Sequence, residues 1–163
     1  MVRLWVHSGL VCWILGSVLL GSAAWAGQQF VAEGAAFSGY DAVVHQDDGK
    51  AVRGDTSITA DSNGATWRFT SADHRAQFQA NPARYAPAYD AHCAYAASEG
   101  RKSAGNPKMW QVAQDLLYLL CSKTAVETWI TEFDARLARA DANWVTLEAL
   151  AAAIPISPPP LAR

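Results

Sequence analysis

The amino-acid sequence predicts an α+β fold, with a small antiparallel sheet, built from a hairpin and a C-terminal strand pair, covered by several helices. Two short runs of strand-forming residues flank Asn63-Gly64, the turn pair that most favours a tight hairpin. A second pair of apolar runs occupies 110–113 and 116–120. Apolar residues then recur at helical spacing over 126–137, which indicates a helix that packs on this sheet.

The first 26 residues have the parts of a secretory signal peptide. Arg3 gives a basic head, and the apolar run over 10–20 is shorter than the roughly 20 residues that cross a bilayer as a helix. Residues 24–26 read Ala-Trp-Ala, the small-x-small pattern of a cleavage site. We therefore predict an exported, periplasmic protein, cleaved after Ala26, with no membrane span once the peptide is removed. The alternative is an uncleaved N-terminal anchor.

The N-terminal half of the mature chain is predicted to contain strands. Residues 27–38 show little periodicity and are interpreted as a lead-in segment, so the domain is expected over 39–154. The run 40–45 contains two valines and is predicted to be a strand that ends in an Asp-Gly turn. The hairpin strands are placed at 57–60 and 65–69, on either side of the Asn-Gly pair.

Two helices are expected next along the chain. Ser71 precedes a helical run over 72–80, which its hydroxyl can cap. That run stops at Asn81-Pro82, because the residue before a proline avoids the helical region. A short helix of good formers follows over 91–99, with Gly100 placed as its C-cap.

The C-terminal half combines a buried strand with helices. The run 116–120 is nearly all apolar, so we expect it to be central or covered on both faces. Thr124 precedes Glu127 by three positions, the spacing of a capping box at the start of the amphipathic helix. A last helix is predicted over 144–153, and the Pro-rich residues 155–163 are predicted to be a disordered tail.

Composition excludes some classes of function. The chain has 13 Lys and Arg against 15 Asp and Glu, without the basic patch that a nucleic-acid-binding protein requires. Two cysteines, Cys93 and Cys121, follow the predicted signal peptide. In an oxidising compartment, two cysteines usually form a disulfide. They can equally be two soft metal ligands.

Short motifs along most of the mature chain occur in a particular order. They are Gly39-Tyr40-Asp41-Ala42-Val43, 63–69 (Asn-Gly-Ala-Thr-Trp-Arg-Phe), 81–87 (Asn-Pro-Ala-Arg-Tyr-Ala-Pro), Cys93-Ala94-Tyr95-Ala96 and Ala140-Asp141-Ala142-Asn143-Trp144. In this order and spacing the chain resembles the YHS domain family, in particular its exported single-domain members. The resemblance implies a compact α+β unit with a link to metal handling.

The resemblance also indicates where a metal ion would bind. In YHS modules of heavy-metal transport proteins, a cysteine just after the second hairpin strand and another four residues later can bind metal. In this chain Thr70 and His74 stand at those positions. The exported members have instead a cysteine in a Cys-Ala-Tyr-Ala context, which here is Cys93.

The predicted metal site therefore consists of Cys93 with His92, His74 or Cys121. Thiolate and imidazole suit copper(I) or zinc, so we expect a module that binds a soft metal ion. His45 and Met109 are further soft donors that could join it.

Three alternatives to the metal site stay open at this point. One is a structural or interaction domain, with a Cys93–Cys121 disulfide and an unknown protein partner. Another is a buried apolar cysteine beside a surface histidine. The third is an enzyme or redox protein that uses Cys93. The sequence has none of the common catalytic motifs, which favours a binding protein over an enzyme.

Overall fold

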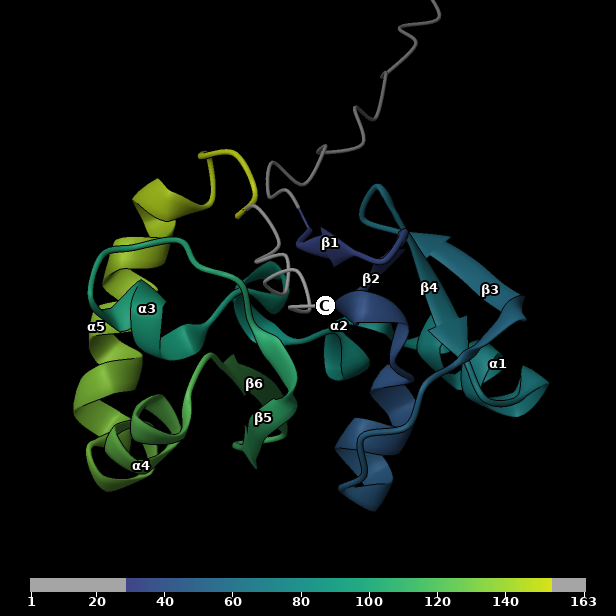
Figure 1. Cartoon of the computed structure of the whole chain (residues 1–163), viewed down its shortest axis with the longest axis horizontal. Coiled ribbons are helices and arrows are strands. Elements are labelled where there is room, and N and C mark those ends of the chain that lie inside the picture. The colour runs from purple at the N-terminus through teal and green to yellow at the C-terminus, as the bar shows by residue number, and fades with distance from the viewer. Residues whose placement is uncertain (1–28, 154–163) are drawn as a thin grey trace, which may run out of the picture.

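The structure is a computed structural model that describes residues 29–153 (Figure 1). The predicted signal peptide, 1–26, and the predicted tail, 155–163, lie outside the described residues. The elements in chain order are β1 (Val31–Ala32), β2 (Ala35–Ala36), η1 (Phe37–Gly39), η2 (Val44–Asp48), β3 (Asp55–Ser62), β4 (Ala65–Phe69), α1 (Ala72–Ala80), α2 (Pro82–Tyr85), η3 (Ala88–Ala91), α3 (Ala94–Ser98), β5 (Asn106–Ala113), β6 (Leu116–Leu120), α4 (Lys123–Thr131) and α5 (Phe133–Leu147).

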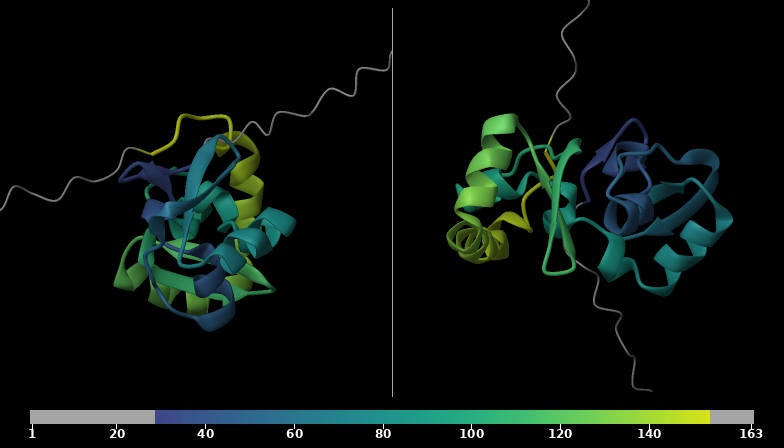
Figure 2. Two further views of the ribbon diagram at one scale, coloured as in Figure 1. Left: turned by 90° about the vertical axis from the view of Figure 1, so that its right-hand side faces the viewer. Right: turned by 90° about the horizontal axis from the view of Figure 1, so that it is seen from below.

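The predicted α+β class is confirmed. In residues 29–153 the strands form three antiparallel two-stranded sheets, β1–β2, β3–β4 and β5–β6. The β5–β6 hairpin stands between the helices α3, α4 and α5 on one side and the β1–β4 and α1 region on the other (Figure 2). Within this part of the chain, no helix has both the length and the apolar character that crossing a membrane requires.

Strand β6 separates two hydrophobic cores. Leu117 and Leu119 belong to the core beneath β1–β4 and α1, whereas Tyr118 and Leu120 belong to the core among α3, α4 and α5. Successive residues of a strand point to opposite faces, so one apolar strand supplies side chains to both cores. The prediction that this strand is covered on both faces is confirmed.

The predicted hairpin over 57–69 is also confirmed. Asn63 and Gly64 both have positive φ, 49° and 70°, as a type I′ turn requires. Trp67 and Phe69 of β4 are buried, and the ring of Phe78 from α1 packs on both, with centroids 4.7 and 5.1 Å away. Helix α1 has the predicted bounds, and the Ser71 hydroxyl caps it by accepting a hydrogen bond from the backbone N–H of His74 (3.1 Å).

The strand predicted over 40–45 is wrong. Its residues turn into a helical segment that contains η2, because the Asp41 carboxylate accepts hydrogen bonds from the backbone N–H groups of Val43 (2.9 Å) and Val44 (3.3 Å). These are the free N–H groups of a helix start, so side-chain capping overrides the strand preference of the two valines. The segment ends at Gly49, whose φ of 64° reverses the chain.

The helix predicted over 91–99 is shorter than expected. Helix α3 begins only at Ala94, because His92 and Cys93 are extended and form isolated bridges with Ala104 and Leu119. The predicted C-cap is confirmed, since Gly100 has a φ of 72° and its N–H donates to the carbonyl of Ala97 (2.9 Å).

The long C-terminal helix is divided. A break at Glu132 separates α4 from α5, and Ile130, which the predicted stripe places against the sheet, is 53% exposed. The predicted helix over 144–153 is the last turn of α5 followed by irregular chain. The capping box is wrong as well, because Ser122, not Thr124, caps α4 by accepting a hydrogen bond from the N–H of Ala125 (3.1 Å).

Replacing Ser122 with alanine should test this cap. The change leaves the N–H of Ala125 without its side-chain acceptor, so we expect the free energy of unfolding to fall by about 1 kcal/mol. Thr124→Ala is the matched control, because Thr124 is exposed inside the first turn of α4, and we expect little change. Urea denaturation of the two variants measures both effects. A larger loss of unfolding free energy for Thr124→Ala than for Ser122→Ala would mean that Thr124 caps α4, as the capping-box spacing predicts.

The segment 27–38, in which the sequence predicts no element, contains the small β1–β2 hairpin. Glu33 and Gly34 have positive φ, 54° and 71°, at its turn. Ala35, Ala36 and Phe37 after the turn are completely buried. The missed signal is the Glu-Gly turn followed at once by small and aromatic apolar residues.

Candidate functional site

Cys93 lies at the junction between the extended segment 92–93 and helix α3. It occupies the N-cap position of α3, and its side chain is completely buried. Its backbone N–H donates to the carbonyl of Ser103 (2.9 Å), and the residue pairs with Leu119 of β6. The thiol is therefore fixed from three sides, by the helix start, the 103–105 segment and the central strand.

Cys121 is two residues beyond Leu119, directly after β6 ends. It is exposed, and so are the next three residues. The Cys93 and Cys121 side chains lie close enough to influence each other's ionisation, and both cysteines are free thiols. The pairing of Cys93 with β6 explains this contact, because it brings α3 alongside the end of the strand.

The interaction between the two thiols makes them chemically different. It raises the pKa of Cys93, and burial adds to that rise, so Cys93 keeps its proton. The same interaction lowers the pKa of Cys121 to about 7, against the effect of its partial burial and with help from the positive charge of Arg101. The pair thus consists of a buried thiol and an exposed sulfur that ionises near neutral pH.

His92 precedes Cys93 in the sequence but does not share its site. Its ring is 1% exposed; Nδ1–H donates to the carbonyl of Tyr89 (3.0 Å) and Nε2 accepts from the backbone N–H of Ala153 (3.0 Å). Burial lowers the pKa of His92 to about 4, and the nearby Lys102 cation acts in the same direction. Both ring nitrogens are already bonded, so this predicted ligand serves as a structural link to the chain after α5.

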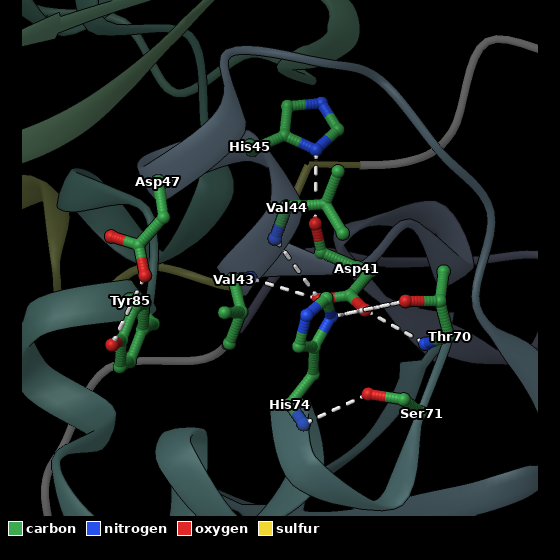
Figure 3. Close-up of polar contacts among 9 residues, drawn as sticks. All are labelled: Asp41, Val43, Val44, His45, Asp47, Thr70, Ser71, His74 and Tyr85. Atoms are coloured by element: carbon green, nitrogen blue, oxygen red, sulfur yellow. Dashed lines mark hydrogen bonds and ion pairs between the residues drawn. The ribbon is translucent and has the colours of Figure 1, made fainter.

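His74 lies in the first turn of α1, and its Nδ1 is 2.8 Å from Oδ2 of Asp41 (Figure 3). Within residues 29–153, no three His, Cys, Asp or Glu side chains gather where they could hold a metal ion, so His74 does not complete a site with the two cysteines. Of the four predicted ligands, the structure brings together Cys93 and Cys121.

Asp41 is the residue that the sequence interpretation missed. Its carboxylate is completely buried; Oδ1 accepts from the backbone of Val43 and Val44, and Oδ2 accepts from the N–H (2.7 Å) and hydroxyl (2.8 Å) of Thr70 as well as from His74 (Figure 3). Burial opposes ionisation of Asp41, but the hydrogen bonds outweigh it and hold its pKa below the ordinary value. The sequence signal that could have revealed this cluster is an aspartate, Asp41, two and three residues before backbone N–H groups that it can cap as a helix begins.

The Asp41 cluster orients His74 without giving it a reaction partner. The Nδ1 of His74 faces the carboxylate, and the side chain is 27% exposed. Thr70 is bonded to the Nδ1 side, so it is not placed as a nucleophile for this histidine. The arrangement joins the η2 segment, the end of β4 and the start of α1.

His45 is a second structural histidine. It is completely buried, with Nδ1 3.0 Å from the carbonyl of Asp41 and Nε2 2.8 Å from the carbonyl of Pro107. Burial lowers its pKa, although both carbonyls and the Asp41 charge oppose that shift. Since both nitrogens face carbonyl oxygens, His45 links η2 to the start of β5 and does not act as the further soft donor considered from the sequence.

Comparisons with known proteins give no relative for this chain. No family model matches it, and neither a curated protein nor a solved structure does. The resemblance to the YHS family therefore stays a prediction.

Proposed function

We propose that Cys93 and Cys121 bind copper(I) between their two sulfur atoms. The observation that carries the proposal is the pairing of Cys93 with Leu119, two residues before Cys121, because it brings two sulfur donors close to each other. Thiolate sulfur is the donor type that selects copper(I). The exposed Cys121 gives the ion an entry path, while the buried Cys93 shields the other side of the site.

The size of the site favours copper(I) over zinc, the other metal that the sequence suggests. Structural zinc almost always takes four protein ligands in a tetrahedron, and catalytic zinc takes three. Residues 29–153 hold no group of three suitable side chains. Copper(I) is a soft monovalent ion that two sulfur ligands can hold, so the dithiol fits it better.

A disulfide is the second candidate function, and the same contact supports it. In the chain-entropy model, a bond between Cys93 and Cys121 would stabilise the fold by roughly 3–4 kcal/mol, since it closes a loop through β5 and β6. The protein would then be a structural or interaction domain for an unknown partner. The predicted export, which stays a prediction, would place it in an oxidising compartment.

A competitive copper(I) titration of the reduced protein tests the proposal under anaerobic conditions. We expect one copper ion per parent chain, and affinities lower by about tenfold or more for Cys93→Ser and for Cys121→Ser, because each variant keeps one thiolate. His74→Gln is the matched control, since His74 lies at a predicted ligand position outside the dithiol, and it should bind like the parent.

Two results would count against copper binding. One is a Cys121→Ser variant that binds as tightly as the parent. The other is a parent protein whose mass, before any reductant is added, is already lower by two protons and which binds no copper after reduction. The second result would favour the disulfide-stabilised domain.

A further inference from the structure

The two thiols differ sharply in access. Cys93 is completely buried, whereas Cys121 is exposed at the head of an exposed stretch that continues through Thr124. Their side chains are nonetheless close together, because Cys93 pairs with Leu119, two residues before Cys121. A reagent in solution can thus reach the sulfur of Cys121, and the buried thiol of Cys93 lies next to that sulfur.

We infer that this pair carries out thiol–disulfide exchange, with Cys121 as the attacking thiol and Cys93 as the resolving thiol. The substrate is a small, accessible disulfide, RSSR. The activity uses the proposed copper site but does not depend on copper, because both steps need only the two cysteines and the disulfide.

The exchange has two balanced steps. The Cys121 thiolate attacks one sulfur of RSSR, the S–S bond breaks, and one RS⁻ leaves while a mixed disulfide forms on Cys121. Cys93 then attacks the Cys121 sulfur, its proton goes to solvent, and the second RS⁻ leaves. The protein dithiol is oxidised by two electrons to a Cys93–Cys121 disulfide, and RSSR is reduced to two thiols.

The order of the two cysteines follows from their places in the fold. An incoming disulfide cannot reach the buried Cys93, whose backbone is held by Ser103 and Leu119. Once the mixed disulfide exists, Cys93 is already beside the sulfur that it must attack. The exposed Arg101 interacts electrostatically with Cys121 and should also attract a negatively charged disulfide.

Oxidised glutathione is a suitable probe, because it is a small disulfide with a net negative charge. The reduced, metal-free full chain is mixed with it, quenched with acid and followed by intact mass. All proteins carry Cys12→Ser, so that Cys93 and Cys121 are the remaining cysteines of the three in the sequence. Cys93→Ser and Cys121→Ser are compared with this parent.

We expect the parent to end as an internal disulfide, two protons lighter, with two molecules of glutathione released per chain. Cys93→Ser should stop at a stable mixed disulfide on Cys121. Cys121→Ser should react at least about tenfold more slowly than Cys93→Ser, because burial protects Cys93. Cys121→Ala serves as a second variant, and circular dichroism shows that each protein is folded.

Three outcomes would overturn the inference. Equal reactivity of Cys93→Ser and Cys121→Ser would remove the distinction between the thiols. A parent that accumulates the mixed disulfide without closing would remove the resolving role of Cys93, and an unreactive Cys93→Ser would remove the attacking role of Cys121. None of these affects the anaerobic copper titration, so exchange and copper binding can fail separately.

Two disulfides of different charge test whether Arg101 attracts an anionic substrate. Arg101→Gln should slow the reaction with oxidised glutathione, and should leave the reaction with the neutral hydroxyethyl disulfide unchanged. Equal slowing with both disulfides would show that Arg101 does not select an anionic substrate.

Discussion

Replacing Asp41 with asparagine is expected to lower the free energy of unfolding by about 3–5 kcal/mol, because the change removes the charge from a buried, fully bonded carboxylate. The asparagine side chain has nearly the same shape, but an NH₂ group replaces one of the two carboxylate oxygens. In either orientation this group faces backbone N–H donors, those of Val43 and Val44 or that of Thr70. The start of η2, the end of β4 and the start of α1 lose their shared acceptor together.

Urea denaturation at neutral pH measures the effect. Asp48→Asn is the matched control, since Asp48 is exposed at the end of η2, and it should change the free energy of unfolding by less than about 0.5 kcal/mol. Because the pKa of Asp41 is lowered in the folded protein, its contribution is present above the unfolded pKa and is lost as the pH falls through the folded pKa. A loss for Asp41→Asn no larger than that of the control would contradict the role of Asp41 as the centre of this cluster.

Acid should destabilise the protein through His92. The pKa of this buried histidine is lowered from 6.5 to about 4 in the folded state, so the unfolded chain binds the proton more readily. The stability that the neutral ring provides is complete above pH 6.5 and is lost as the pH falls toward 4. The shift corresponds to about 3 kcal/mol between pH 7 and pH 4.

A comparison with His92→Gln isolates this contribution from that of Asp41 and of His45, whose pKa is also lowered. Unfolding free energies are measured for both proteins across the range. The parent should lose about 3 kcal/mol more than the variant between pH 7 and pH 4. Parallel curves would mean that His92 takes up a proton as readily in the folded protein as in the unfolded chain, which would contradict the role of Nε2 as the acceptor for the N–H of Ala153.

The sequence predicts those elements of the fold whose formation depends on residues that are neighbours along the chain. The Asn63-Gly64 turn, the Ser71 cap and the apolar strand 116–120 depend on neighbouring residues, and all three are confirmed. The strand over 40–45 failed because the side chain of Asp41 caps the backbone two and three residues later. That competition between capping and strand preference is visible in the sequence only when each aspartate is tested as a helix cap.

The candidate site depends on long-range packing, so the sequence suggested four residues for it, of which the structure brings two together. Cys93 and Cys121 are 28 positions apart in the sequence, and the pairing of Cys93 with Leu119 brings them together. The adjacency of His92 and Cys93 in the sequence suggested a shared site. An extended backbone sends neighbouring side chains to opposite sides, so His92 joins the chain near Ala153 and Cys93 faces Cys121.

The anaerobic copper(I) titration of the reduced parent beside Cys121→Ser is the sharpest test of copper binding by the two thiols, because Cys121 is the exposed half of the dithiol. If the two sulfurs hold the ion, the parent binds one copper per chain and the variant binds about tenfold more weakly or worse. Equal binding by the two proteins would contradict a functional site at Cys93 and Cys121.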